Sequence, residues 1–243
     1  MILFTAAEED SSKPTQLFEE ADLDFLHLPL ERYVEIDDEQ QIEQEFGQID
    51  EYENIIHGRK RSAIFFMDQV EKRDMLEPVQ NRLNLALHQE TADYLEDHGV
   101  PAVLPGEETR GIKLVEFMLR LQRYGKTLYP CGTHESEDIP GFLKELDIEV
   151  TELPLFELEG PGDAKLDEFQ QKVANKSLDT VIFYNRRSVN RIRAAFPELD
   201  YEQVTVVAAD SAITDKLADN KIKADITASG SWDSIVEKLQ EKE

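Results

Sequence analysis

The sequence lacks several features that would place it outside an ordinary reducing cell interior. It has one cysteine, Cys131, in 243 residues, which excludes an internal disulfide. It has no apolar run approaching the roughly 18 residues that a membrane-spanning helix needs. The opening segment MILFTAAEEDSS carries no basic stretch ahead of an apolar one, so we expect no signal peptide. These features together predict a soluble, cytoplasmic protein.

Basic residues are also scarce. Lys and Arg number 26 against 52 Asp and Glu, which gives a formal net charge of −26. Nucleic acids and anionic membranes are bound through basic patches, so the charge predicts neither as a partner. We interpret the acidity as a heavily solvated surface that is suited to a salty cytoplasm, where charges are screened over a few ångströms.

Familiar catalytic motifs are missing as well. There is no glycine-rich phosphate loop and no G-x-S-x-G turn. The five histidines are scattered and only one cysteine is present, so no metal-ligand spacing occurs and we predict no metal. Cys131 has no orienting His–Asn pair and is expected to be a small structural residue. The basic run GRKR at 58–61 is expected to be a solvated loop ahead of a strand.

Short apolar runs alternate with helix-like segments along the chain. The runs predict buried strands at 1–6, 62–67, 83–87, 126–131, 179–184 and 203–209. Helices are predicted at 91–99, where Gly99 is a stop signal, at 139–147, and at 231–243 after the capping residue Ser231. Strands that alternate with helices in this way predict an α/β protein with parallel sheets covered on both faces.

One pattern is used twice. Residues 62–72 resemble 180–191 as an apolar strand followed by a polar turn and a helix, and residues 83–118 match 204–239 element by element. In the second pair Thr91, Leu95, Val100 and Ala102 fall opposite Ile213, Leu217, Ile222 and Ala224. The repeat predicts two similar α/β domains.

The phrase LPL, which occurs at 28–30 and at 153–155, suggests where the domains meet. Proline is tolerated at the edge or start of a strand, so extended segments with Pro29 and Pro154 suit crossings between domains. We predict one domain from 1–29 with 157–243, a second from 33–153, and linkers at 28–33 and 153–158. The alternative is that both phrases are edge strands of a single sheet.

The loops after the predicted strands are the candidate binding sites. In open α/β sheets, ligands bind beyond the carboxyl ends of the strands, where helix N-termini offer free N–H groups. Here those loops are rich in small polar residues and poor in acid–base pairs. Two such domains on a hinge would hold a large polar anion mainly through backbone N–H groups, aided by Arg186 and Arg187.

Four segments resemble the uroporphyrinogen-III synthase family. In 128–159 a strand ending in Pro and small residues leads to a helix and then to a returning strand, as in that family. HQETADYLEDHGV resembles the family's G-x-x-T-A-x-x-L-x-x-x-G segment, with Thr91 at its Thr. VIFYNRRSV and ITASGSWDSIVEKL resemble two further family segments. The resemblance covers nearly the whole chain and rests on the order and spacing of the segments.

The resemblance implies a fold and an activity. The fold would be two similar flavodoxin-like domains, with parallel sheets flanked by helices, joined by a two-stranded hinge. The activity would be that of a lyase in haem biosynthesis. Linear hydroxymethylbilane, which carries eight carboxylates, would lose water and close to uroporphyrinogen III with ring D inverted. The resemblance implies no cofactor, a small-molecule tetrapyrrole substrate and a monomer.

The resemblance also implies site residues. Substrate-binding residues would be Thr5, Met67, Asp68, Thr91, Cys131, Gly132, Thr133, Tyr184, Asn185, Arg186, Ser188, Ser211, Ala212 and Ser229. The sequence departs from the family at Phe156, which takes the position of a tyrosine thought to assist loss of the hydroxyl, and at Ile213, which takes that of a threonine. Tyr184, Tyr129 and Tyr33 remain as candidates for the tyrosine's role.

Two other functions stay open at this point. A diverged protein of the same fold would bind a tetrapyrrole or another anion without turnover. An unrelated two-domain binder of the hinged type would usually be exported, which the absence of a predicted signal peptide disfavours.

Overall fold

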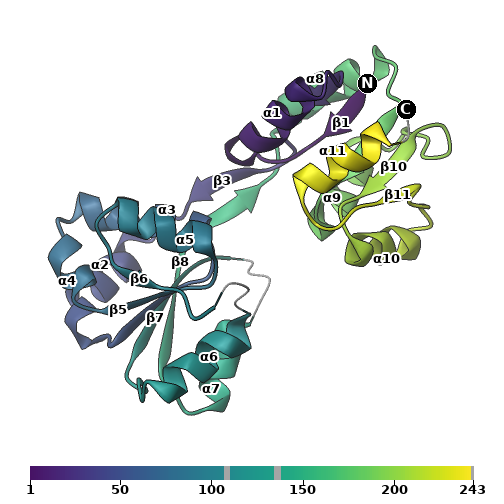
Figure 1. Ribbon diagram of the computed structural model, residues 1–243. Helices are drawn as coiled ribbons and strands as arrows, with labels where there is room; N and C mark the ends of the chain where they lie inside the picture. Colours follow the sequence, from purple (N-terminus) through teal and green to yellow (C-terminus); the bar gives the residue numbers. More distant parts are fainter. Residues whose placement is uncertain (107–109, 134–137, 242–243) are drawn as a thin grey trace. The chain divides into compact units, whose positions relative to one another are not determined.

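The computed structural model describes residues 1–106, 110–133 and 138–241 (Figure 1). The chain divides into two compact units, and each is described by itself. Unit 1 comprises residues 1–33 and 159–243, and unit 2 comprises residues 34–158. The chain therefore passes from one unit to the other twice. The linkers at 28–33 and 153–158 remain a prediction.

Unit 1 is built on a parallel sheet with the strand order β11-β10-β9-β1-β2. The strands are β1 (Ile2–Phe4), β2 (Phe25–His27), β9 (Thr180–Phe183), β10 (Thr205–Ala208) and β11 (Ile226–Thr227). The central strand β9 and its neighbour β1 are buried along their whole length. This is why both read as continuous apolar runs in the sequence.

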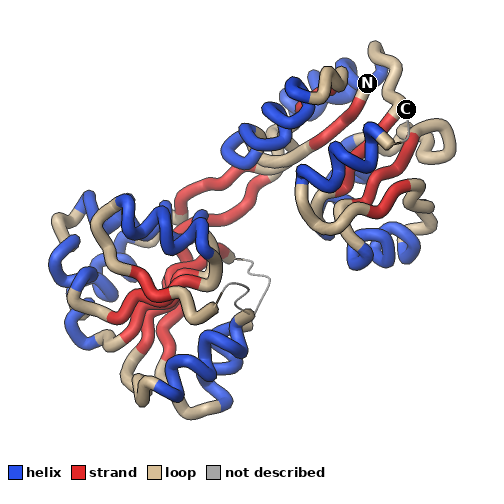
Figure 2. Tube along the Cα trace, viewed as in Figure 1, coloured by secondary structure: helices blue, strands red, loops and turns tan. Residues whose placement is uncertain are grey.

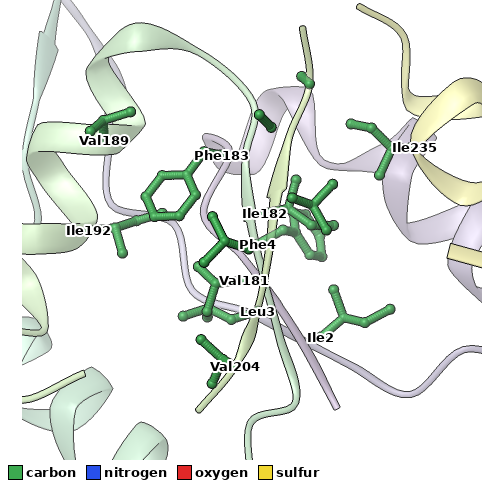
Figure 3. Packing of buried hydrophobic residues seen from close by; sticks show 14 of the residues in the cluster. Ile2, Leu3, Phe4, Val181, Ile182, Phe183, Val189, Ile192, Val204 and Ile235 are labelled. Carbon is green, nitrogen blue, oxygen red and sulfur yellow. The ribbon is translucent and has the colours of Figure 1, made fainter. Parts of the chain in front are cut away.

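Helices cover both faces of the unit 1 sheet. They are α1 (Ser12–Glu20), α8 (Asp163–Ala174), α9 (Arg186–Ala195), α10 (Ser211–Asp219) and α11 (Trp232–Gln240), with a 3-10 turn η1 (Glu8–Asp10). Helices α1 and α11 pack together, and α9 packs with α10. Figure 3 shows Phe183 beside Val189 and Ile192 of α9, whereas Ile235 of α11 lies on the other side of the strands. Each face of the sheet therefore has its own layer of buried side chains.

Unit 2 repeats this plan with the strand order β3-β8-β7-β4-β5-β6. The strands are β3 (Arg32–Glu35), β4 (Asn54–His57), β5 (Leu83–Ala86), β6 (Ala102–Val103), β7 (Thr127–Gly132) and β8 (Val150–Glu159). The strands from β8 to β6 pair in parallel. β3 begins in unit 1 and continues the chain into unit 2.

The unit 2 helices also form two layers (Figures 1 and 2). They are α2 (Glu39–Gly47), α3 (Lys60–Lys72), α4 (Leu76–Gln80), α5 (Gln89–Asp97), α6 (Gly111–Arg120) and α7 (Ile139–Glu145), with a 3-10 turn η2 (Ile49–Glu51). Helix α3 packs against α5, and α6 packs against α7. The two pairs lie on opposite faces of the sheet.

The predicted α/β class, with parallel sheets flanked by helices, is confirmed. The order β4-β5-β6 in unit 2 corresponds to β9-β10-β11 in unit 1, and β7–β8 correspond to β1–β2. The matched core positions agree, because Leu95, Leu217, Val100 and Ile222 are all buried. The leucines of the two LPL phrases are buried as well. Leu28, Leu30, Leu153 and Leu155 are each at most 2% exposed.

The prediction of a strand at 62–67 is wrong. These residues belong to α3, and the strand that precedes this helix is β4, which the sequence analysis missed. Ala63, Phe66, Met67 and Val70 are the buried apolar positions, spaced as on one face of a helix. The run SAIFFM is short and largely apolar, so strand and helix patterns overlap in it.

Helix ends were predicted more successfully. Gly99 follows α5 with a φ of +80°, a left-handed conformation that glycine adopts without strain. Ser231 caps α11, because its hydroxyl accepts a hydrogen bond from the backbone N–H of Ser234 at 3.1 Å. Within the described ranges, none of the helices combines the length and the apolar character that crossing a membrane requires.

Candidate functional site

The carboxyl ends of the unit 1 strands gather polar side chains at one edge of the sheet. Thr5 follows β1, Tyr184 and Asn185 follow β9, Ser211 begins α10 after β10, and Ser229 follows β11. Since these strands are parallel neighbours, their carboxyl ends meet at the same edge. The structure therefore brings these five predicted residues together within unit 1.

Tyr184 is the half-buried aromatic residue of this edge. Its ring stacks on Trp232, the first residue of α11, with centroids 4.2 Å apart and planes only 4° from parallel. Beside it Lys13 of α1 forms an ion pair with Asp233 at 2.6 Å. The hydrogen bond to Asp233 raises the pKa of Lys13, and Tyr184 is close enough to add to that shift. The phenol ring of Tyr184 is therefore held in place by its stack on Trp232, and the ammonium group of Lys13 lies nearby.

Two of the predicted residues at this edge have a structural task. Asn185 caps α9 by accepting from the N–H of Ser188 at 2.8 Å, and the Ser188 hydroxyl donates back to the Asn185 carbonyl at 2.6 Å. Asp210 caps α10 in a similar way. The side chains of Asn185 and Ser188 are therefore committed to the helix. Arg186 is exposed in the first turn of α9, and Ala212 is half-buried in α10.

A buried carboxylate holds the chain where it leaves unit 1. Glu31 is 7% exposed, and one of its oxygens lies 3.1 Å from Nε of Arg191 and 3.6 Å from Nε of Arg187. Arg191 also donates to the carbonyl of Leu30 at 3.0 Å. Arg187, which the sequence suggested as an aid to anion binding, is thus partly engaged with the protein's own carboxylate.

The corresponding edge of unit 2 contains four predicted residues. Thr91 lies in the first turn of α5, fully buried, and its hydroxyl has no hydrogen-bond partner among the described residues. Cys131 and Gly132 end β7 and are buried, whereas Thr133 is exposed and its N–H donates to the Phe156 carbonyl at 3.1 Å. The rest of the predicted loop, from His134 to Ser136, falls outside the described residues.

Comparison with protein families gives these edges a context. The family model described as uroporphyrinogen-III synthase HemD matches residues 12–232. The chain belongs to the uroporphyrinogen-III synthase family. The match reaches across both units and confirms the resemblance found in the sequence, together with the lyase of tetrapyrrole synthesis that it implied. The family implies a small-molecule tetrapyrrole as substrate.

Two solved structures share the fold of this uroporphyrinogen-III synthase family member. A uroporphyrinogen-III synthetase from Helicobacter pylori is 16% identical, with a TM-score of 0.68 and 90% of this chain and 93% of that chain covered. A mutant uroporphyrinogen III synthase from Thermus thermophilus is 14% identical, with a TM-score of 0.64 and coverage of 100% and 99%. A comparison with curated proteins finds no match.

Phe156 takes the place that the family resemblance gives to a tyrosine. It is 6% exposed, and its ring stacks on Phe65 of α3 with centroids 4.8 Å apart. The ring also covers Gly132 so closely that a Cβ there would collide with it. The position is therefore a packed aromatic contact with no acidic proton.

The other two tyrosine candidates differ from Tyr184. Tyr129 is 2% exposed in β7 and belongs to the unit 2 core, with its hydroxyl against Gly58. Tyr33 in β3 donates its hydroxyl hydrogen to the carboxylate of Asp10 at 2.8 Å. The phenol of Tyr129 is therefore enclosed in the core, and the phenol of Tyr33 is hydrogen-bonded to a carboxylate.

Two predicted binding residues are not at a strand end. Met67 is 1% exposed, and Asp68 is an exposed residue on the following position of α3. Both were placed in a loop because 62–67 was taken for a strand, and that placement is wrong. Although Asp68 is exposed as a whole, partial desolvation of its carboxyl is the largest effect and raises its pKa. The residues that follow β4 are instead Gly58 and the basic run 59–61, and the pair Ile55–Ile56 ahead of them was the only apolar signal of the strand.

One histidine is enclosed at the end of β4. His57 is fully buried, and its Nε2 lies 3.2 Å from Oδ1 of Asn84. Burial is the main cause that lowers its pKa to about 4, so the ring is neutral at neutral pH. In the described part of the chain, no three His, Cys, Asp or Glu side chains are grouped so that they could hold a metal ion.

Proposed function

We propose that this chain closes hydroxymethylbilane to uroporphyrinogen III, inverting ring D and releasing water. The observation that carries the proposal is the family match over residues 12–232, which takes in both units and the helices that begin at both sheet edges. The substrate is a flexible, reactive polycarboxylate. The enzyme has to hold it in the conformation that gives the inverted product before it closes spontaneously.

The chemistry suits polar edges without strong acid–base pairs. The substrate's hydroxyl leaves as water and an azafulvene forms; ring D is then attacked at its substituted position, and the spiro intermediate rearranges. The attack and the rearrangement both depend on holding the reacting carbons close together. Backbone N–H groups and hydroxyls at the strand ends supply fixed dipoles for the substrate's carboxylates and for developing charge.

We assign the proton donor for hydroxyl loss to Tyr184. It is a half-buried phenol at a strand end, whereas Tyr129 is enclosed in the core of unit 2 and Tyr33 donates its hydroxyl hydrogen to the carboxylate of Asp10. Its stack on Trp232 fixes the ring, and the ammonium of Lys13 stabilises the phenolate that remains after proton transfer.

Substrate contacts are proposed at both edges. The proposed residues are Thr5, Tyr184, Arg186, Ser211, Ala212 and Ser229 in unit 1, and Thr91, Cys131, Gly132 and Thr133 in unit 2. Asn185 and Ser188 would contribute backbone groups, since their side chains cap α9. We further propose that the protein is a cytoplasmic monomer that needs no cofactor. We also propose that it binds no nucleic acid, in keeping with its net charge of −26.

A coupled assay tests the activity. Porphobilinogen and a hydroxymethylbilane-forming enzyme are mixed with the protein at low and at molar salt, the products are oxidised, and type I and type III porphyrins are separated. A type III fraction that grows with added protein supports the proposal. Type I alone at every salt concentration, from protein shown to be folded, refutes it.

One observation favours a second candidate function. Phe156 packs its ring against Phe65 and offers no proton where a tyrosine was expected. A chain that had lost the chemistry would still bind a tetrapyrrole at the same strand ends. Tight binding of the bilane in a separate equilibrium measurement, together with no type III product in the coupled assay, identifies that outcome.

A further inference from the structure

The segment that leaves unit 1 after β2, residues 28–31, is held to that unit along its length. The N–H of Leu28 donates to the carbonyl of Phe4 at 3.1 Å, and Leu28 and Leu30 are both buried. Glu31 is buried as well, and its Oε2 lies 3.1 Å from Nε of Arg191. Arg191 also donates to the carbonyl of Leu30 at 3.0 Å. Backbone and side-chain contacts therefore hold the same short segment, which we call the outgoing segment.

Arg191 lies where three parts of unit 1 meet. It belongs to α9 together with Arg187, whose Nε is 3.6 Å from the same oxygen of Glu31. This oxygen accepts no hydrogen bond from the described residues, so the contact is one between charges. A Cβ added to Gly160, which follows β8 on the chain's return to unit 1, would lie 3.3 Å from the guanidinium of Arg191. The outgoing segment and the returning chain therefore pass the same side chain of α9.

Beyond Glu31, ion pairs of the chain involve carboxylates that are much more exposed. Arg32 pairs with Glu159 at 2.8 Å, and Glu35 pairs with Lys72 of α3 at 2.7 Å. The side chains of Glu159 and Glu35 are 43% and 46% exposed, whereas that of Glu31 is 8% exposed. Exposed pairs contribute little to stability, whereas removing one partner of a buried pair is strongly destabilising. The ion pair that holds the chain most firmly is therefore the one at Glu31.

Helix α9, which holds Glu31, begins at the strand-end edge of unit 1. Tyr184, the proposed proton donor, lies between β9 and this helix, and Arg186 is the first residue of the helix. Arg187 and Arg191 are four residues apart, so they lie on the same side of α9 and both reach Glu31. The pairing therefore joins the helix that follows the proposed proton donor to the chain that continues into unit 2.

We propose that Glu31 is a positioning residue for the reaction: paired with Arg191 and Arg187, it fixes the outgoing segment to α9 and confines bending of the chain to the residues that follow. This inference rests on the proposed function, because the positioning serves that reaction. The rearrangement needs its reacting carbons close together, and a displacement of about 1 Å far from the chemistry can lower a rate about a hundredfold. Glu31 acts through α9 and needs no contact with the substrate.

Hydrogen exchange measured by mass spectrometry tests the contact without any substrate. In Glu31→Gln, peptides that cover residues 28–31 should exchange at least about tenfold faster than in the wild type, while peptides from β5 and β10 should change by less than about twofold. Glu35→Gln is the matched control, since it removes a more exposed carboxylate four residues later and should leave exchange at 28–31 within about twofold. No acceleration in Glu31→Gln, an equal acceleration in the control, or an equal acceleration throughout unit 1 overturns the proposal.

A double variant separates positioning from stability. Replacing both partners of a buried ion pair by apolar residues of similar size is often neutral, so Glu31→Leu/Arg191→Met should melt within about 3 °C of the wild type. Its kcat for type III formation should nevertheless be at least about tenfold lower, with KM within about threefold. Normal melting together with the wild-type kcat would mean that the pair is only structural, and it overturns the proposal.

Two further results are decided by the same measurements. If the double variant melts lower, the kcat of Glu31→Gln below its own midpoint is judged by the same tenfold criterion. A wild-type protein without type III activity refutes the proposed function and with it the role in the reaction. The exchange of residues 28–31 still shows, in that case, whether Glu31 holds the outgoing segment.

Discussion

A phenylalanine has no acidic proton, so the packing of Phe156 moves the question of hydroxyl loss to another residue. Its ring fills the space between Phe65 and Gly132, and the contact belongs to the core of unit 2. Tyr184 combines a phenol, a fixed ring and a neighbouring ammonium at a strand end of unit 1. At the scale of single residues, the proposed reaction depends most on this tyrosine.

Replacing Tyr184 by Phe tests the assignment. The stack on Trp232 should persist, so the fold should be retained, while loss of the proton donor should lower kcat for type III formation by about a hundredfold. KM should change little, because the hydroxyl is needed during bond breaking. Tyr129→Phe and Tyr33→Phe are the matched controls, and a larger loss in either would reassign the role.

His57 makes a separate, pH-dependent contribution to stability. Its pKa is lowered from 6.5 to about 4 in the folded protein, so the unfolded chain takes up a proton that the native state refuses. This contribution is fully present above about pH 6.5 and is lost as the pH falls toward 4. Between about pH 7.5 and 5 the loss should be about 2 kcal/mol.

Urea unfolding of the wild type and His57→Gln at those two pH values measures this effect. The variant should be less stable at neutral pH but should lose about 2 kcal/mol less on acidification, since the carboxylates titrate alike in both proteins. Parallel losses in the two proteins would mean that His57 is not the buried neutral group the structure places at the end of β4.

At the scale of elements, caps hold the polar edge in place. Ser231 and Ser234 form a reciprocal pair at the start of α11, in which the N–H of Ser234 donates to the Ser231 hydroxyl and the Ser234 hydroxyl donates to the Ser231 carbonyl. Trp232, on which Tyr184 stacks, is the next residue. The cap therefore fixes both the helix and the aromatic support of the proposed proton donor.

Ser231→Ala should lower the free energy of unfolding by about 1 kcal/mol, the usual cost of removing an N-cap side chain. Ser229→Ala is the control two residues earlier: its side chain is exposed and should change stability by less than about 0.5 kcal/mol. Chemical denaturation of the three proteins gives the comparison. Equal effects of the two substitutions would contradict the capping geometry.

The same scale shows what the sequence could and could not predict. Strands β1, β5, β7, β9 and β10 were predicted because buried parallel strands read as continuous apolar runs. The start of α3 was not predicted, because the run SAIFFM is so short and apolar that a buried strand and a buried helix face have the same pattern in it. Because of that error, Met67 and Asp68 were predicted to lie at a strand end. Gly58 and the basic residues after it, which do follow a strand, were not recognised as strand-end residues.

Site residues were predictable where chain position alone decides their place. Thr5, Thr91 and Ser211 belong to the ends of strands that were recognised, and they lie at the strand ends. What the sequence could not supply was the use of each side chain. The stack of Tyr184 on Trp232 joins residues far apart in the sequence, which spacing does not encode. The cap that Asn185 forms with Ser188 is local, but it was not separated from a binding role.

At the scale of the whole molecule, the excess of negative charge has the largest expected effect on stability. The net charge of −26 destabilises the compact state through self-repulsion, and ion pairs such as Lys13–Asp233 and Lys72–Glu35 are too exposed to offset it. Added salt screens this repulsion. Stability should therefore increase with ionic strength, unlike that of a protein held together by surface ion pairs.

Thermal unfolding in KCl measures this. The midpoint should rise by about 10 °C or more between about 0.1 M and 1 M, where the Debye length has fallen to about 3 Å. Most of the increase should be complete by about 1 M, since further salt has little repulsion left to screen. A midpoint that stays constant or falls over this range would contradict the interpretation of the acidic surface.

Inversion of ring D is the proposed activity of the molecule. Preformed hydroxymethylbilane with a ¹³C label beside ring D is mixed with the protein at molar KCl in a single turnover, and the product is examined by NMR. We expect label in the arrangement of the type III isomer, formed faster than spontaneous closure and in proportion to protein concentration. Label only in the type I arrangement, formed at the spontaneous rate with folded protein present, would contradict it.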